Sequence, residues 1–208
     1  MRNSAKSQVR ADFLARRRAL APDAIRTASQ HACQQLAQTL LWQQSQHIAF
    51  YVAHDNELDP SPLLALAHSQ HKTCYLPHLA PDDHRQLLMI RYQPGDPLAN
   101  NRYGIPEPLH DPTKVIAPDQ LNLVLVPLLA FDKAGTRLGM GQGYYDQTFA
   151  FLNQQPYSQQ PQLAGLAYHF QEYPELARDP WDVGLDLIVT DQKVIDTTGI
   201  ASIAAGKP

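Results

Sequence analysis

Short apolar runs alternate along this chain with longer segments of helical periodicity. The run from Leu121 to Ala130 is apolar at nearly every position, which is typical of a strand buried on both faces of a sheet. We expect further strands at residues 47–53, 73–79, 87–92, 162–168 and 185–190, and helices at residues 4–20, 23–41, 61–70 and 144–152. Strands separated by helices predict an α/β fold with a mostly parallel sheet covered by helices on both faces.

The length of the chain, 208 residues, suits a single domain with a sizeable core. We expect this domain to span residues 1–196 and residues 197–208 to form a flexible C-terminal tail. A long connection at residues 93–118 separates two of the predicted strands. Four of its prolines, at positions 106, 108, 112 and 118, should make it stiff, so it is a candidate wall or lid beside a functional site.

Composition narrows the class of protein further. Hydrophobic residues make up 44% of the chain, and the net charge is −3, so neither nucleic acid nor a membrane surface is an expected partner. No apolar run approaches the roughly 18 residues of a membrane span. Cys33 and Cys74 form no metal-binding spacing, and we expect two buried thiols in a reducing compartment. These features favour a cytoplasmic enzyme, which we expect to be a monomer.

The N-terminal segment is strongly basic, with only one acidic residue, Asp12, before residue 20. Such a segment can resemble an organelle transit peptide, but it has no apolar core, which excludes a secretory signal. A basic, solvated helix face is the simpler interpretation, and we expect Arg16, Arg17 and Arg18 to be plain surface charge.

A glycine-rich stretch follows the central apolar run. Residues 135–146 read Gly-Thr-Arg-Leu-Gly-Met-Gly-Gln-Gly-Tyr-Tyr-Asp and hold four of the ten glycines. A strand that leads through a glycine loop into a helix is typical of phosphate sites, because backbone N–H groups and the helix N-terminus can approach an anion. Arg137 adds a forked cation for phosphate oxygens, and Asp146 adds an oxygen ligand suited to Mg²⁺.

The spacing alone does not identify this loop. It lacks the Lys-Ser/Thr of a Walker A loop, and its third glycine is misplaced for a dinucleotide-binding fingerprint. A tight structural turn, with Arg137 in a structural ion pair, therefore remains a possible interpretation.

The longer segment Val126–Asp146 resembles the central motif of the 5-formyltetrahydrofolate cyclo-ligases, also called 5,10-methenyltetrahydrofolate synthetases. Four further segments resemble motifs of that family in the same order, and together the matches cover roughly residues 6 to 195. These segments are Lys6–Arg10, Phe50–Asp59, Tyr103–Pro108 and Asp182–Asp191.

The resemblance implies conversion of 5-formyltetrahydrofolate and ATP into 5,10-methenyltetrahydrofolate, ADP and phosphate, with Mg²⁺ as cofactor. It implies catalytic roles for Arg137 and Tyr144, and Mg²⁺ ligation by Asp146 and Asp182. It implies contacts to the folate from Val52, Glu57 and Tyr144. The residues that it implies for ATP binding are Lys6, Arg10, Arg137, Leu138, Gly139, Met140, Gly141, Gln142, Gly143 and Tyr145.

Several of these roles have competing interpretations. Glu57 could be a surface residue in a turn, and Asp179 and Asp186 compete with Asp182 for the metal, although we take Asp186 as structural. Many family members carry a basic residue where this chain has Gln142 and a histidine where it has Trp181, which could change nucleotide affinity.

A phosphosugar isomerase or ligand-sensing module that does not use ATP would need the glycine loop but not Lys6 or Arg10. A general ATPase or kinase is disfavoured by the missing Walker A and kinase motifs.

Overall fold

The computed structural model describes residues 2–81, 85–154 and 161–198. The α-helices are α1 Arg2–Arg18, α2 Pro22–Ala37, α3 Leu40–Gln44, α4 Ser61–Ser69 and α5 Tyr144–Thr148. The 3₁₀ helices are η1 Pro112–Lys114, η2 Pro118–Gln120, η3 Ala150–Asn153 and η4 His169–Gln171. The strands are β1 His47–Ala49, β2 Thr73–Leu79, β3 Leu87–Tyr92, β4 Leu98–Asn100, β5 Pro106–Pro108, β6 Val115–Ile116, β7 Leu123–Pro127, β8 Ala130–Phe131, β9 Arg137–Leu138, β10 Gln162–Ala167, β11 Leu187–Thr190 and β12 Val194–Asp196.

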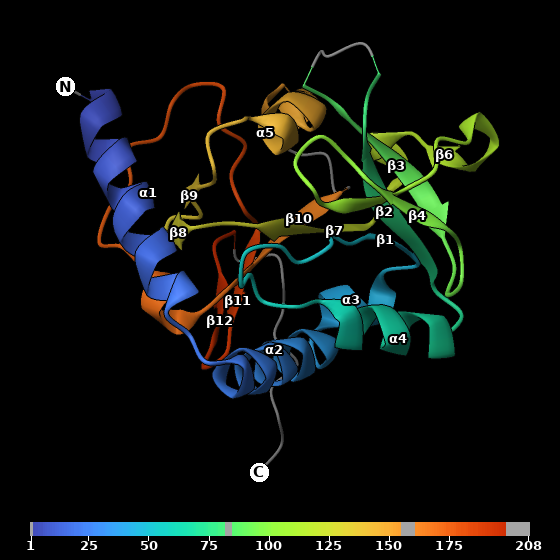
Figure 1. The fold of residues 1–208 in the computed structure, drawn as a ribbon, viewed down its shortest axis with the longest axis horizontal. Coiled ribbons are helices and arrows are strands. Elements are labelled where there is room, and N and C mark those ends of the chain that lie inside the picture. Colours follow the sequence, from blue (N-terminus) through green and yellow to red (C-terminus); the bar gives the residue numbers. More distant parts are fainter. Residues whose placement is uncertain (1, 82–84, 155–160, 199–208) are drawn as a thin grey trace.

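One eight-stranded sheet forms the centre of the molecule, in the order β12-β11-β10-β7-β1-β2-β3-β6 (Figure 1). Strands β11, β10, β7, β1 and β2 are parallel, whereas β12, β3 and β6 pair antiparallel at the two edges. The predicted α/β fold with a mostly parallel sheet is therefore confirmed. The central strand β7 has the sequence Leu-Val-Leu-Val-Pro, and its first four residues are buried, as expected for a strand covered on both faces.

Helices cover the two faces of the sheet unequally. Helices α2, α3 and α4 pack on one face, where Leu36, Trp42 and Leu63 join a core with alternate residues of the strands. On the other face, α5, η3 and the segment at residues 183–185 bury Phe149 and Val183 against the sheet. Each large apolar side chain buried in this way contributes about 1.5–3 kcal/mol.

Helix α1 packs beside the sheet, against the small antiparallel hairpin of β8 and β9 (Figure 1). Phe13 is buried there with Ala130 and Leu138. Because this hairpin leads directly into the glycine-rich loop, the packing of Phe13 brings the N-terminal half of α1 alongside that loop.

Several predicted elements are shorter or broken in the structure. The helix predicted at residues 23–41 ends at Ala37, and α3 begins anew because the Thr39 hydroxyl accepts a hydrogen bond from the Trp42 N–H at 3.1 Å. The strand predicted at residues 47–53 leaves the sheet after Ala49. The helix predicted at residues 144–152 is interrupted at Phe149 and continues as a 3₁₀ turn.

The strand predicted at residues 121–130 was too long, because the chain leaves the large sheet after β7 and pairs Ala130 with Leu138 in the hairpin instead. The edge strands β6 and β12 and the β4–β5 hairpin were not predicted. Each is only two or three residues long, so it carries too little periodicity to be recognised.

The predicted C-terminal tail lies mostly outside the described residues, which end at position 198. Thr197, the first residue of the predicted tail, is bound to the fold, since its hydroxyl donates to the Leu185 carbonyl at 2.5 Å and its N–H donates to the Asp186 carbonyl at 3.1 Å. Among the described residues, no helix combines the length and apolarity needed to cross a bilayer.

Candidate active site

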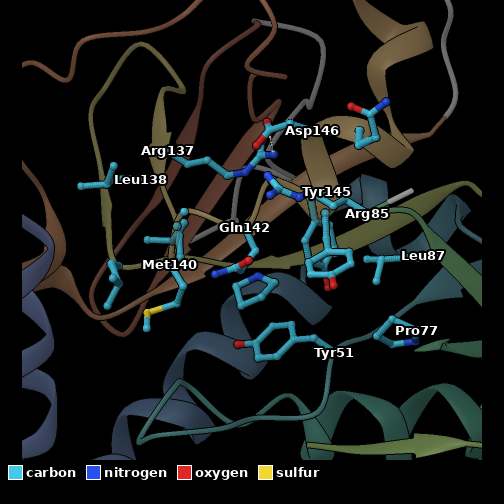
Figure 2. Close-up of a pocket in the computed structure, with 18 of the residues that line it drawn as sticks. Tyr51, Pro77, Arg85, Leu87, Arg137, Leu138, Met140, Gln142, Tyr145 and Asp146 are labelled. Carbon is cyan, nitrogen blue, oxygen red and sulfur yellow. Dashed lines mark hydrogen bonds and ion pairs between the residues drawn. The ribbon is translucent and has the colours of Figure 1, made fainter. Parts of the chain in front are cut away.

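A cavity of about 940 Å³ lies where the carboxyl ends of β1, β2 and β7 meet the glycine-rich loop. Ligands of open α/β sheets commonly bind at this edge. Every residue to which the sequence analysis assigned a site role lines this one cavity: Lys6, Arg10, Val52, Glu57, Arg137, Leu138, Gly139, Met140, Gly141, Gln142, Gly143, Tyr144, Tyr145, Asp146 and Asp182. Figure 2 shows part of this wall, with Arg137 and Asp146 at one side and Tyr51 and Pro77 across the space from them. The structure brings these residues together, and their individual roles remain predictions.

The glycine-rich loop runs from Gly139 to Gly143 between β9 and α5. Gly141 and Gly143 have φ of 93° and 74°, a conformation that favours glycine over residues with a side chain. No residue that the structure describes accepts a hydrogen bond from the N–H groups of residues 139–143. The following helix α5 has only five residues, so its dipole is weaker than the sequence suggested. For an anion bound at this loop, the loop N–H groups would therefore be the main hydrogen-bond donors.

Arg137 projects from β9 toward Asp146 (Figure 2). Its Nη2 lies 2.6 Å from Asp146 Oδ1, its Nη1 donates to the Val183 carbonyl, and its side chain is only 6% exposed. Burial lowers the pKa of Arg137, while Asp146 and Asp182 oppose that shift. The structural ion pair that the sequence left open is therefore present, and it holds the guanidinium on the cavity wall.

The two predicted metal ligands lie on neighbouring segments. Asp146 Oδ1 accepts a hydrogen bond from the Val183 N–H at 3.0 Å, which fixes the segment carrying Asp182 beside α5. Asp182 Oδ2 accepts from the Asp179 N–H at 2.8 Å. The second oxygen of each carboxylate accepts no hydrogen bond from a described residue. No group of three or more potential ligand side chains occurs among the described residues.

Two cations of α1 lie over this part of the cavity. Lys6 Nζ is 2.6 Å from Asp179 Oδ2 and 3.7 Å from Asp182 Oδ2. Arg10 Nε donates to the Gly139 carbonyl at 2.9 Å, and its guanidinium lies 3.5 Å from where a Cβ on Gly141 would sit. Asp179, considered as an alternative to Asp182, thus serves here as the ion-pair partner of Lys6.

Glu57 occupies the opposite part of the cavity, in a tight turn after β1. Its Oε2 accepts a hydrogen bond from the His54 N–H at 3.1 Å, and its side chain is 13% exposed. Burial raises the pKa of Glu57 to about 7, although the nearby Arg17 lowers it. Glu57 is in a turn, as the simpler interpretation held, but its carboxylate faces the cavity and not the surface.

The aromatic residues of α5 line the space between these two parts. Tyr145 stacks on Phe149, and burial raises the pKa of Tyr145, with Glu57 adding to the shift and Arg137 opposing it. Tyr144 lies toward the proline-rich connection, where its hydroxyl accepts from Arg102 at 2.5 Å and lies 3.2 Å from the Tyr103 hydroxyl.

The proline-rich connection forms a wall of the cavity, as predicted, through the β4–β5 hairpin. Glu107 fastens it to β2: one carboxylate oxygen lies 2.9 Å from His78 Nδ1, and the other accepts from the Leu79 N–H at 3.1 Å. The role of this glutamate could not be inferred from the sequence, because the contact joins segments that are 28 residues apart.

The expectation that Arg17 is surface charge was wrong. Arg17 is 1% exposed and contacts the turn that carries Glu57, whereas Arg18 has an exposed side chain. A signal for this was present in the sequence. Lys6, Arg10, Phe13 and Arg17 follow each other at intervals of four, three and four residues, which places them on one helix face.

Two other expectations concern residues outside the cavity. Cys33 and Cys74 are buried free thiols, as predicted, and burial raises their pKa values to about 12 and about 11. Asp186 is structural, as predicted, because its carboxylate accepts from the Leu163 N–H at 2.8 Å.

Comparison with known proteins places these features in context. The model of the 5-formyltetrahydrofolate cyclo-ligase family matches residues 2–191. The chain is 38% identical over 164 residues to the 5-formyltetrahydrofolate cyclo-ligase of Haemophilus influenzae, covering 78% of this chain and 83% of that protein. It is 36% identical over 179 residues to the Escherichia coli K12 enzyme of the same name, covering 86% and 96%. Among solved structures, the 5,10-methenyltetrahydrofolate synthetase of Aquifex aeolicus superposes with a TM-score of 0.77 at 28% identity, covering 93% of each chain. That of Mycoplasma pneumoniae superposes with a TM-score of 0.68 at 27% identity, covering 89% of this chain and 98% of that one.

Proposed function

This chain belongs to the 5-formyltetrahydrofolate cyclo-ligase family, and on that premise we propose that it is the enzyme that converts 5-formyltetrahydrofolate into 5,10-methenyltetrahydrofolate at the expense of ATP. One observation carries the proposal. A loop whose five backbone N–H groups have no acceptor among the described residues and a buried carboxylate line the same cavity, so an anion and a hydrogen-bond-donating ring can bind side by side.

The reaction explains why both kinds of group are needed. The formyl group on N5 is an amide, whose carbon is a weak electrophile and whose oxygen is a poor leaving group. Transfer of the γ-phosphoryl group to that oxygen releases ADP and makes the carbon resemble an iminium ion. N10 then attacks the carbon and loses its proton to solvent, and the C–O bond breaks with departure of inorganic phosphate. Such phosphoryl transfer depends on positioning and on electrostatic stabilisation of the phosphate oxygens.

The glycine-loop side of the cavity suits the nucleotide. Its N–H groups can donate to the phosphates, and three cations surround them: Lys6 and Arg10 from α1, and Arg137 from β9. Each cation is held by a carboxylate or a carbonyl in the structure, so its position is set before the nucleotide arrives. Preorganised charge of this kind costs little reorganisation during the reaction.

Asp146 and Asp182 fit a magnesium ion. Each offers a carboxylate oxygen without a hydrogen-bond donor among the described residues, and the Val183 N–H holds the two segments together. Two carboxylates without further protein ligands match the habit of Mg²⁺, which takes its other ligands from water and phosphate. When bound, the ion would neutralise charge on the phosphates that Arg137 and Lys6 flank.

The other side of the cavity suits the folate. An ionised Glu57 can accept two parallel hydrogen bonds from N–H groups of the pterin ring, and Val52 offers an apolar surface to that ring. Tyr144, tied to Arg102 and Tyr103, would border the substrate between the two sides.

The reaction can be followed directly by the absorbance of the methenyl product. We expect the absorbance to rise when the protein is mixed with 5-formyltetrahydrofolate, ATP and Mg²⁺, with one ADP and one phosphate formed per ring closed. If the formyl oxygen carries ¹⁸O, the label should appear in inorganic phosphate. Ring closure at the same rate without ATP, or phosphate without the label, would contradict the proposed chemistry.

Binding of the nucleotide can be tested separately through tryptophan fluorescence. The chain has two tryptophans, of which Trp42 is 1% exposed in the core and Trp181 is 67% exposed on the cavity wall. We expect Mg-ADP to change the emission of the wild type and of a Trp42→Phe variant, but not that of Trp181→Phe. A response that persists in Trp181→Phe would move the nucleotide away from this wall.

A further inference from the structure

Arg17 is the one member of the Arg16-Arg17-Arg18 run whose side chain is buried. Its side chain is 2% exposed, whereas that of Arg18 is 60% exposed. Arg16 lies over the rings of Phe13 and Phe170. A buried guanidinium is costly unless it is paired and hydrogen-bonded, so its partners indicate what it does.

The partners of Arg17 converge on the turn that carries Glu57. Its Nε donates to the Asp55 carbonyl at 2.8 Å, and its Nη1 lies 3.6 Å from Glu57 Oε1. The turn contacts the helix in return, because the side-chain amide of Asn56 donates to the Arg17 carbonyl at 3.3 Å. Asp55 and Asn56 both have positive φ, at 51° and 61°, so this turn is strained and needs external support.

Hydrogen bonds to backbone carbonyls do not by themselves explain why the Arg17 guanidinium is buried. Its Nη1 is 3.4 Å from the Leu128 carbonyl, but that carbonyl also accepts from Gln171 Nε2 at 3.1 Å. The contact that no other described side chain provides is the one to Glu57 Oε1. Since Glu57 Oε2 accepts from the His54 N–H, the two carboxylate oxygens are held by different partners.

We propose that Arg17 is a positioning residue for Glu57, orienting its carboxylate toward the folate side of the cavity and favouring its charged form. This inference rests on the proposed function for the identity of the ligand. It goes beyond that function because Arg17 is absent from the cavity wall and acts through another residue.

The surroundings of Glu57 explain why one cation matters there. Burial raises the pKa of Glu57 to about 7, and Arg17 is the largest influence that lowers it. His54 and Asp55 flank it on its own turn, and Asp55 raises its pKa further. The tyrosines packed near it are Tyr51 after β1, Tyr145 on α5 and Tyr168 after β10, and burial raises the pKa of each, so they stay neutral. Without Arg17, Glu57 would hold its proton at neutral pH and could accept fewer hydrogen bonds from a ring N–H.

The test compares Arg17→Gln with Arg18→Gln. Both arginines belong to α1 and contact Asp55, but Arg18 is exposed and does not contact Glu57, so it is a matched control. The titration of Glu57 in the ligand-free protein is followed by NMR of its ¹³C-labelled carboxyl carbon. We expect the midpoint to rise by about one pH unit in Arg17→Gln and to stay within a few tenths in Arg18→Gln.

Kinetics provide the second readout. At pH 7, we expect Arg17→Gln to raise the KM for 5-formyltetrahydrofolate by about fivefold, because a midpoint that rises by one pH unit from about 7 lowers the ionised fraction of Glu57 from about one half to about one eleventh. The KM for ATP should stay within about twofold. The defect should shrink as the pH rises, because Glu57 then ionises without help. A loss of activity that is equal at every pH, with an unshifted Glu57 midpoint, would show that Arg17 is only structural.

Two further results keep the inference testable. A measurement on the wild type replaces the variant if Arg17→Gln does not fold. The ¹⁵N signals of the Arg17 guanidinium should titrate with the same midpoint as Glu57, and this titration should vanish in Glu57→Gln. Arg17 signals that do not respond to Glu57 would overturn the inference. The NMR titration needs no substrate, so it can fail while the wild type still closes the folate ring, and it can succeed even if the proposed function is wrong.

Discussion

The two sides of the cavity differ in the number and the pairing of their charged groups. On the glycine-loop side, several cations are paired with carboxylates or carbonyls, as Arg137 is with Asp146 at 2.6 Å, and the loop N–H groups remain open. On the other side, the carboxylate of Glu57 lies among buried tyrosines, with the Arg17 guanidinium 3.6 Å away. In the function that we propose, the first side receives the highly charged nucleotide, and the second recognises the pterin ring through a few hydrogen bonds.

This difference also determines how sensitive each side is to substitution and pH. Charges on the glycine-loop side are balanced within the structure and include groups such as Asp146, whose side chain is 26% exposed. The charge on Glu57 depends on one buried partner, so it can be gained or lost near neutral pH. We therefore expect substitutions to affect catalysis most on the first side and pH dependence most on the second.

The largest effect should follow from Arg137→Ala. Loss of a preorganised cation at the reacting phosphate should lower kcat/KM for ATP by about 10²–10³-fold. Lys133→Ala is the control, because Lys133 lies on the same hairpin with a 73% exposed side chain and should leave turnover unchanged. Circular dichroism checks the fold of both variants. If Arg137→Ala is folded and turns over normally, the guanidinium is only a structural ion-pair partner.

The next effect concerns stability on the Glu57 side. The pKa of Glu57 is about 7 in the folded protein and about 4.5 in the unfolded chain. Between these pH values the folded protein therefore keeps the proton on Glu57, whereas the unfolded chain loses it. As the pH rises from 4.5 to 7, the unfolded chain ionises while the folded protein does not, and the free energy of unfolding falls. Relative to Glu57→Gln, the free energy of unfolding of the wild type should fall by about 2–3 kcal/mol over this range and level off above about pH 8.

Urea unfolding at pH 4.5, 5.5, 7 and 8 measures this difference. Comparison with Glu57→Gln removes the contributions of the other titrating groups, which both proteins share. Parallel pH profiles for the two proteins would mean that Glu57 ionises normally and that the contrast between the two sides is absent.

A smaller effect is expected for Asp146→Asn. Removing one charged ligand should raise the Mg²⁺ concentration needed for half-maximal activity by at least about tenfold, as even outer-shell partners of a metal are worth that much. The Arg137 ion pair is weakened too, so the activity at saturating Mg²⁺ should be compared. A magnesium titration identical to that of the wild type would exclude Asp146 as a ligand.

The smallest effect should follow from Gly141→Ala. A Cβ at φ of 93° costs about 1 kcal/mol in backbone strain, which should displace the loop N–H groups, so the KM for ATP should rise about fivefold. Gly95→Ala is the matched control, because Gly95 has φ of 95° and lies outside the cavity wall. It should lose similar stability with an unchanged KM for ATP. Equal effects on KM would mean that strain, and not the loop, sets nucleotide affinity.

The glycine-loop side could be predicted from the sequence because its chemistry is local. Arg137, the glycines and Asp146 lie within ten consecutive positions, so one local segment brings them together, and the family resemblance implies their roles. The resemblance also implied that Lys6 and Arg10 contribute, and their spacing of one helical turn is consistent with a common face. The parallel sheet was predictable for the same reason, because buried strands such as β7 are apolar without interruption.

The Glu57 side could be predicted only in part, because it is assembled from distant segments. Glu57 was assigned to the substrate, but its support by Arg17 joins residues 40 positions apart, and the three consecutive arginines look alike in the sequence. The break between α2 and α3 depends on one hydrogen bond from Trp42 to Thr39, and the hairpin of β8 and β9 depends on the register of Ala130 with Leu138. Tertiary contacts decide such features, and local propensity does not.

The account rests on the binding of nucleotide phosphates by the loop at residues 139–143. A crystal structure with ADP and Mg²⁺ tests this most directly. The account predicts that the phosphates accept hydrogen bonds from the N–H groups of this loop, with the ion bound between them and the carboxylates of Asp146 and Asp182. Density for ADP at another part of the protein, with the loop N–H groups still free, would contradict it.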